Sequence, residues 1–353
     1  MTAPSSTITS AGVAKAARHT VSRGGRATLL GLVGSTAVLL AMAALPYLVD
    51  PSLTSQLVKL CYLVTLATMW NLLAGYAGMV SIGQQAYIGL GAYALFVVND
   101  HGLNVYAGTI VVSVVVGLLA WPVSYIAFRL RGGYFAVGTW VIAEVVQLIV
   151  VRFRSLGSAS GRSLSSVTQD PLLRGAYTYW LAVAVMAAAL LGTFAVLRGR
   201  LGLDLQAIRD DETAAASLGV RVTRGKRAIY ILAAAGCAAA GAVICVYTLG
   251  VASPAQIFGV QYSALMIFMV VIGGIGTIEG PIIGAVAYFL LDKYFAQAGV
   301  WYLVVVGACA IVISLYLPRG LWGTLAHRTG FSVFPVRHFV RSPTVTRDSK
   351  QPE

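Results

Sequence analysis

The sequence predicts an all-α, polytopic membrane protein, a bundle of about ten transmembrane helices. Of its 353 residues, 58% are hydrophobic and 10% are charged, whereas an average soluble domain carries roughly 25% charged residues. Too little polar surface remains to cover a soluble particle of this size, so apolar surface must face lipid. Apolar runs of about 20 residues, the length that crosses a bilayer, recur along most of the chain.

The first apolar run covers 29–49 and exceeds the h-region of a signal peptide, which has about 7–15 residues. We therefore expect a retained first helix within a membrane domain of residues 29–326. A basic tail precedes this domain at 1–28, and a polar tail follows it at 327–353. The predicted spans are 29–49, 57–75, 79–98, 106–128, 134–151, 179–197, 228–250, 261–278, 281–297 and 301–317.

The net charge of +13 indicates orientation in a membrane rather than binding to nucleic acid. Lys and Arg accumulate in cytoplasmic loops, and most basic residues here fall on one side if the N-terminus is inside. Both termini are then cytoplasmic. The predicted outer loop 152–178 runs against this bias, because it contains Arg152, Arg154, Arg162 and Arg174.

Catalytic and metal-binding patterns are absent from the sequence. The four cysteines each lie inside an apolar run, and the four histidines lie in tails or a loop, so we expect no metal site. A nucleotide-binding P-loop needs G-x-x-x-x-G-K-[ST]. The run Gly219–Arg227 has one residue too many, and Arg227 stands where Ser or Thr is required. We expect neither enzymatic activity nor a bound cofactor.

The predicted inner loop 198–227 is the most charged part of the chain. Its centre, Asp204–Gly219, reads as about four turns of helix, with Asp204 as N-cap and Gly219 as the C-terminal stop. One face collects Leu205, Ile208, Ala215 and Leu218, and another collects Arg209, Asp210, Asp211 and Glu212. Such a helix can lie in a groove on a partner, or it can lie on the membrane surface or fold under the bundle.

Two glycine-rich segments, Gly75–Gly91 and Gly273–Gly284, lie about 200 residues apart. Glycine lets helices approach closely in lipid, and it permits helix breaks where backbone lines a cavity. The candidate pathway residues in these segments are Gly83, Gln84, Gln85, Tyr87, Gly273 and Gly274. The alternatives are plain close packing for the glycines and structural hydrogen bonds between helices for the polar side chains.

Glu144 is the one acid well inside a predicted span. A charged side chain at this depth is costly, so we expect it to face the bundle interior and to have a partner. It joins the candidate pathway residues, with a structural role as the alternative. A proton relay would need further ionisable groups inside the spans.

Five segments in order resemble the signature of branched-chain amino acid ABC permeases of the LivM type. They are Asn71–Tyr93 (NLLAGYAGMVSIGQQAYIGLGAY), Arg129–Thr139 (RLRGGYFAVGT) with Ala143 and Glu144, Ala207–Ala215 (AIRDDETAA) with Leu218–Val220, Val271–Gly284 (VIGGIGTIEGPIIG) and Pro318–Leu321 (PRGL). The chain departs from many relatives at Gln84 and Gln85 and in its long basic N-terminal tail, which leaves the substrate open.

The resemblance implies a permease subunit of an ATP-binding-cassette importer in a bacterial inner membrane. The partners implied are two ATPase subunits that use ATP and Mg, a second LivH-like permease and an extracytoplasmic substrate-binding protein. The resemblance also implies that the inner loop couples to the ATPases, through Asp204, Ile208, Arg209, Asp210, Glu212 and Gly219.

The substrates implied are leucine, isoleucine and valine, other amino acids, urea, short amides or small organic acids. Two other functions stay open. An ion-driven secondary transporter would need paired ionisable groups inside the membrane, and a membrane scaffold would need no transport pathway.

Overall fold

The computed structural model describes residues 50–158, 170–248, 253–295 and 320–329, with isolated positions outside these ranges. Every regular element in the described part is a helix. Six helices are long and apolar enough to cross a membrane, namely Pro51–Tyr76, Val105–Ala127, Gly133–Arg152, Leu173–Arg198, Val222–Tyr247 and Pro254–Gly273. The prediction of a polytopic helix bundle is therefore confirmed.

The predicted count of about ten spans exceeds the six that the described residues show. Most of the predicted span 29–49, about half of 301–317 and most of the two tails lie outside the described residues. The runs predicted at 79–98 and 281–297 form the shorter helices α3 (Gln85–Asp100) and α12 (Glu279–Phe295). The side of the membrane on which the termini lie stays a prediction.

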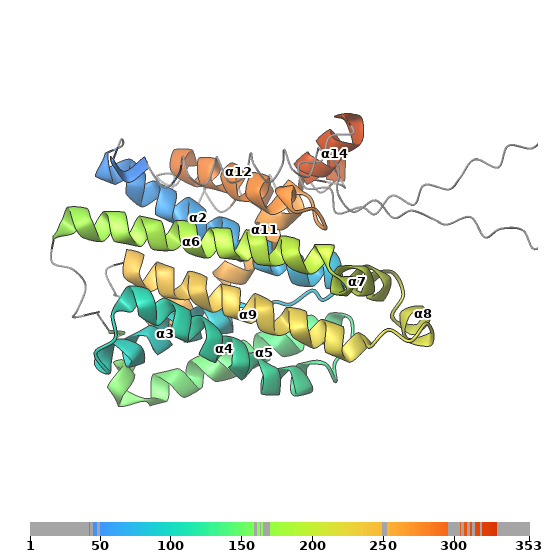
Figure 1. The fold of residues 1–353 in the computed structure, drawn as a ribbon, viewed down its shortest axis with the longest axis horizontal. Helices are drawn as coiled ribbons and strands as arrows, with labels where there is room; N and C mark the ends of the chain where they lie inside the picture. Colours follow the sequence, from blue (N-terminus) through green and yellow to red (C-terminus); the bar gives the residue numbers. More distant parts are fainter. Residues whose placement is uncertain are drawn as a thin grey trace, which may run out of the picture.

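Figure 1 shows the longer helices running roughly along one common axis, with the short α7 and α8 together at one end of the bundle. The remaining elements are η1 (Leu45–Tyr47), α2 (Pro51–Asn71), η2 (Leu72–Tyr76), α4 (Val105–Ala127), α5 (Gly133–Arg152), η3 (Arg154–Leu156), α6 (Pro171–Arg198), α7 (Arg200–Asp210), α8 (Glu212–Ser217), α9 (Val222–Tyr247), α10 (Pro254–Ile257), α11 (Gln261–Gly273) and α14 (Gly320–Thr329).

Helix α2 shows how the sequence starts and stops a span. Pro51 occupies the first turn, where its missing N–H costs nothing. The helix then widens into the π-helical turn η2 and ends at Tyr76. The chain continues without regular helix through 78–84, with Gly78 at φ 66°, before α3 begins. The predicted span 79–98 therefore starts six residues late, because its first residues form a break.

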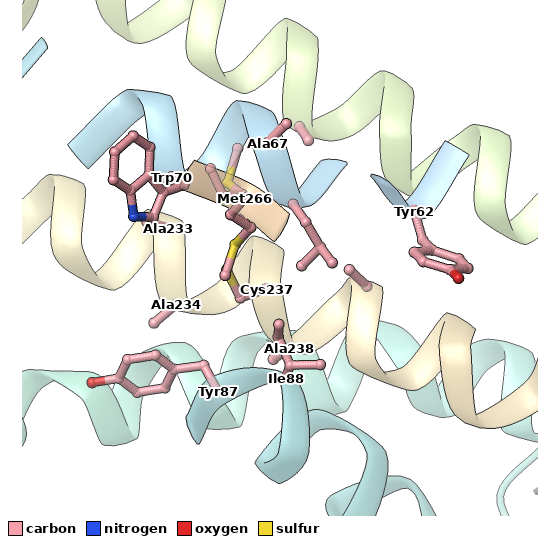
Figure 2. Packing of buried hydrophobic residues seen from close by; sticks show 14 of the residues in the cluster. Tyr62, Ala67, Trp70, Tyr87, Ile88, Ala233, Ala234, Cys237, Ala238 and Met266 are labelled. Carbon is pink, nitrogen blue, oxygen red and sulfur yellow. The ribbon is translucent and has the colours of Figure 1, made fainter. Parts of the chain in front are cut away.

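The core lies where α2 and α3 meet the alanine-rich α9 (Figure 2). Ile88 of α3 lies beside Ala238 of α9 in that view. A side chain at Gly91 would overlap the carbonyl of Ala238, and one at Gly241 would overlap the carbonyl of Ile88. Small residues on both helices thus let the two backbones approach closely, as in other membrane bundles.

Three of the four cysteines lie in the described core. Cys61, Cys237 and Cys245 are free thiols, and all three are buried in the apolar core. Cys309 lies outside the described residues. Buried thiols of this kind act as small apolar groups.

Candidate functional site

The inner loop forms two helices where the sequence predicted one. Helix α7 begins at Arg200 after Gly199, so Asp204 lies inside the helix and the prediction that it is an N-cap was wrong. Asp211 breaks the helix instead: its backbone is extended, and its carboxylate accepts hydrogen bonds from the amides of Thr213 (2.8 Å) and Ala214 (3.0 Å). Aspartate is a preferred N-cap at either place, and the tertiary fold selects Asp211.

Gly219 ends the second helix, as predicted, with φ 84°. This left-handed conformation suits glycine and stops a helix. Helix α8 is also tied to α9 by an ion pair between Lys226 Nζ and Glu212 Oε2 at 2.6 Å. The short helix is therefore fixed at both ends.

The apolar face predicted for the loop is only partly buried. Leu205, Ile208 and Ala215 are buried, but Leu218 is 83% exposed. The break at Asp211 turns α8 away from the axis of α7, so the single apolar stripe expected of one continuous helix does not form. An exposed leucine remains at the tip of the loop.

Arg209 joins the loop to the end of α2. Its Nη1 donates a hydrogen bond to the carbonyl oxygen of Gly75 at 3.0 Å, while the same guanidinium contacts Asp210 at 3.2 Å. Carbonyls at a helix C-terminus lack partners within the helix and favour a cation. Gly78 beside Arg209 has φ 66°, a backbone conformation that favours glycine, and a Cβ there would make only ordinary contact with the arginine side chain, at 3.5 Å.

The two glycine-rich segments meet beside Asn71, the last residue of α2. Its Nδ2 donates to the carbonyl of Thr277, and its Oδ1 accepts from the amide of Gly276, each at 2.8 Å. A Cβ on Gly75 would come within 2.6 Å of the Gly276 nitrogen. The sequence left open whether these glycines break helices or only pack closely, and both segments do contain a break, because the chain is not in regular helix at 78–84 or between α11 and α12.

Gly273 and Gly274 end α11 at this junction. A side chain at Gly273 would overlap the carbonyl of Gly280, and Gly274 has φ 128°, which L side chains rarely adopt. Gly320 at the start of α14 packs against the backbone of Gly274. These glycines make close packing possible, which is the alternative that the sequence left open for them.

Gln84 and Gln85 are fully buried at the start of α3. Gln84 Nε2 lies 3.4 Å from Ser81 Oγ, and the amide oxygen of Gln85 accepts a hydrogen bond from the hydroxyl of Ser263 on α11. Gln84 Oε1 and Gln85 Nε2 have no hydrogen-bond partner among the described residues. An unsatisfied buried polar atom costs about 1–3 kcal/mol. A water molecule or a polar ligand that hydrogen-bonded to these two atoms would remove that cost.

Tyr87 and Gly83 fix the same segment to its neighbours. The hydroxyl of Tyr87 donates to that of Tyr230 on α9 at 2.9 Å, and both tyrosines are buried. A side chain at Gly83 would overlap the carbonyl of Thr139 on α5. The hydroxyl of Thr139 also accepts a hydrogen bond from the amide of Ile82 at 3.3 Å. The break at 78–84 therefore lies directly against α5.

Helix α5 turns Glu144 outward, and the expectation that this acid faces the interior of the bundle was wrong for this chain. Four of its 20 residues are buried, and they are Phe135, Thr139, Ala143 and Val150. Thr139 of this buried stripe faces the break segment. Glu144 is therefore left exposed beside Trp140, whose Nε1 donates a hydrogen bond to the Glu144 carboxyl at 3.0 Å. A charged residue facing lipid at this depth costs at least about 2.5 kcal/mol.

One ion pair was not predicted from the sequence. Lys59 of α2 pairs with Asp292 of α12, and both side chains are largely shielded from solvent. The available signal was that Lys59 lies inside a predicted span, where a cation needs an acidic partner.

The described residues contain no cluster of three or more His, Cys, Asp or Glu side chains that could hold a metal ion. The polar groups that could meet a ligand are the buried amides of Gln84 and Gln85 and the outward carboxyl of Glu144. The arrangement as a whole connects a polar loop to breaks in membrane-embedded helices.

Comparison with known proteins places these features in context. Residues 52–314 match the family described as "Branched-chain amino acid transport system / permease component". The "High-affinity branched-chain amino acid transport system permease protein LivM" of Salmonella typhimurium is 24% identical over 313 residues, which cover 81% of this chain and 73% of the relative. The protein of the same name from Escherichia coli is 22% identical over the same shares. No solved structure matches.

Proposed function

Because this chain belongs to the permease-component family of branched-chain amino acid transport systems, we propose that it forms one half of the translocation pathway of an ATP-driven importer for branched-chain or related amino acids. It is a membrane transport component of a bacterial inner-membrane permease family, not a catalytic subunit. The substrate follows the names of two distant relatives, and it is the part of the proposal that needs direct measurement.

The proposed importer contains this chain, a second LivH-like permease, two ATPase subunits and an extracytoplasmic substrate-binding protein. ATP and Mg are bound by the ATPase subunits, and this chain binds neither. Membrane lipid surrounds the assembly, and nucleic acid has no part in it. The loop formed by α7 and α8 is the proposed contact with an ATPase, and its exposed Leu218 supplies an apolar contact at the tip.

The hydrogen bond from Arg209 to the carbonyl of Gly75 is the observation that carries this proposal. It joins a loop outside the apolar spans to the terminus of a broken membrane helix. Any displacement of α7 along the bundle axis must move the end of α2 or break this bond. A loop that only lay on the membrane surface would not need such a contact.

A displacement of α7 would also be transmitted to α5. The break at 78–84 follows soon after Gly75, and its amide at Ile82 donates to the Thr139 hydroxyl of α5. Gly83 packs directly on the Thr139 carbonyl, with no space between them for even a methyl group. We propose that force applied to the loop reaches α5 through this segment.

A second branch runs through Asn71 to the turn between α11 and α12. Asn71 holds the backbone of Gly276 and Thr277 by two hydrogen bonds. Both glycine-rich breaks therefore respond to the end of α2. In the proposed alternating-access cycle, Gly83, Gln84, Gln85, Tyr87, Gly273, Gly274 and Glu144 line the pathway or border it.

The test is purification of the tagged chain from its host in mild detergent, followed by uptake in proteoliposomes. Co-purification of two ATPases and a second permease, with uptake that needs internal ATP and the binding protein, is the expected result. Reversing the charges with Arg209→Glu and Asp210→Arg should abolish uptake and leave membrane insertion intact. Recovery of the chain alone, or normal uptake by the reversed variant, would contradict the proposal.

The substrate alternatives within the family are urea, short amides and small organic acids. The free acceptor Gln84 Oε1 and the free donor Gln85 Nε2 are chemically suited to any of these groups and do not distinguish among them. Titration of the co-purified binding protein with each compound separates them. Tight binding of an amide or urea and none of leucine would replace the amino acid assignment.

An ion-driven transporter is the other candidate, and the pair between Lys59 and Asp292 favours it, because paired ionisable groups inside a membrane are common in proton pathways. Uptake that collapses with an uncoupler and survives ATP depletion would select this function. A scaffold without transport predicts unchanged uptake after deletion of the chain.

A further inference from the structure

Helix α5 exposes a charged side chain midway along an apolar, outward-facing surface. We define the α5 outer face by the exposed residues Val137, Trp140, Val141, Glu144 and Leu148. Glu144 lies about 16 Å along a helix that is about 30 Å long, so its carboxyl stands near the middle of the membrane. It is the one charged residue between Gly133 and Val151.

Helix α4 supplies a matched comparison within the same chain. It also exposes a broad apolar face, which includes Ile110, Val114 and Leu118. No charged residue occurs between Val105 and Ala127. Acyl chains can therefore cover the α4 face without burying a charge, whereas they cannot satisfy the carboxyl on α5.

Among the described residues, the carboxyl of Glu144 receives one hydrogen bond, from Trp140 Nε1 at 3.0 Å. A carboxylate has two oxygens and about four acceptor positions. The remaining positions point away from this chain, since the side chain is exposed. In a membrane, a donor from outside the described part of the chain is needed to satisfy them.

We propose that the α5 outer face is the surface on which the second permease subunit packs, and that Glu144 accepts a hydrogen bond or ion pair from a donor side chain of that subunit. The inference rests on the proposed function, which supplies the second permease. The proposed series of contacts from the inner loop through the break at Ile82 to Thr139 of α5 then ends at the boundary between the two permeases.

A second copy of this chain fits this face less well than a different subunit does. A symmetric interface brings the same patch of both copies together. The α5 outer face contains a carboxyl and no Lys or Arg before Arg152. Two copies would therefore place Glu144 near its own counterpart without a cation, whereas a different chain can supply one.

The test is photo-crosslinking in membranes that contain the whole complex. Photo-reactive p-benzoyl-phenylalanine is placed at Val141 on α5 or at Val114 on α4, which are 55% and 57% exposed. Val141 should give an adduct with the second permease, identified by mass spectrometry, and Val114 should give none. Equal adducts from both positions, an adduct with a second copy of this chain, or no protein adduct from Val141 would overturn the proposal.

Substitution of the acid tests the role of its carboxyl. Glu144→Leu should lower the amount of second permease that co-purifies by at least about tenfold, because it leaves a buried donor of the partner unpaired. Glu144→Gln keeps an acceptor oxygen and should retain the partner. Unchanged co-purification of the Leu variant, at equal membrane levels of this chain, would contradict the assigned role.

The two proposals fail in different ways. If the importer assignment is wrong, no second permease or ATPase co-purifies with the unmodified chain. If only the α5 assignment is wrong, the complex is recovered and transports, but Val141 does not crosslink to the second permease.

Discussion

Arg209 Nη1 lies 3.0 Å from the carbonyl oxygen of Gly75, which joins α7 to the π-helical end of α2 across 134 positions of sequence. The contact places a guanidinium where the last carbonyls of α2 lack helical partners. It also lies beside Asn71, whose side chain binds the second glycine-rich turn. One junction thus connects the inner loop with both helix breaks.

Arg209→Ala should reduce uptake at least about tenfold while the chain still inserts and assembles. A hydrogen bond from a charged group contributes about 1.5–3 kcal/mol, and its loss frees the end of α2 from α7. The measurement is ATP-driven uptake per amount of purified complex. Arg221→Ala, at an exposed arginine of the same loop, is the control, and an equal loss there would show that general loop charge is responsible.

Gly75→Ala should destabilise the junction. The new Cβ would lie 2.6 Å from the nitrogen of Gly276 and would overlap the Asn71 side chain, and overpacking of this kind costs about 1–3 kcal/mol. Thermal unfolding in detergent should show a lower Tm. Gly192→Ala meets nothing within 4 Å and should leave Tm unchanged or raise it, so a similar fall in both variants would contradict the packing argument.

Asn71→Leu should loosen the turn that follows α11, because it removes both hydrogen bonds and leaves the amide of Gly276 without a partner. We expect a loss of about 1–3 kcal/mol, read as faster hydrogen exchange at Gly276. Asn71→Asp keeps the acceptor for that amide and loses only the donor to Thr277, so it should be less severe. Equal exchange at Gly276 in both variants would show that its amide does not depend on Asn71.

Asp211→Ala should fray α8 without unfolding the bundle. Loss of an N-cap costs about 1 kcal/mol, so the amides of Thr213 and Ala214 should exchange roughly fivefold faster. Asp204→Ala is the matched control, because Asp204 lies inside α7 and caps nothing there. Faster exchange only in the Asp204 variant would restore the helix boundary that the sequence predicted.

The sequence by itself determined the class of this protein. A chain that is 58% hydrophobic with apolar runs of membrane length can bury its backbone polar groups in a bilayer only as helices. The glycines at 273–276 and around residue 78 allowed helix breaks, because glycine alone adopts such backbone conformations freely, but the predicted spans 79–98 and 261–278 ran across both breaks. Gly219 marked a helix end for the same reason.

The tertiary structure decided which surfaces and partners these elements use. Asp204 and Asp211 are equally good caps by local chemistry, and the packing of Ile208 and Leu205 in the bundle selected Asp211. Glu144 was predicted to face inward, but the close approach of Gly83 to Thr139 set the rotation of α5 and turned the acid outward. The Arg209–Gly75 contact likewise depends on residues distant in sequence. Local propensity and hydrophobic periodicity act over a few residues, whereas these outcomes follow from steric fit between helices that only the folded chain brings together.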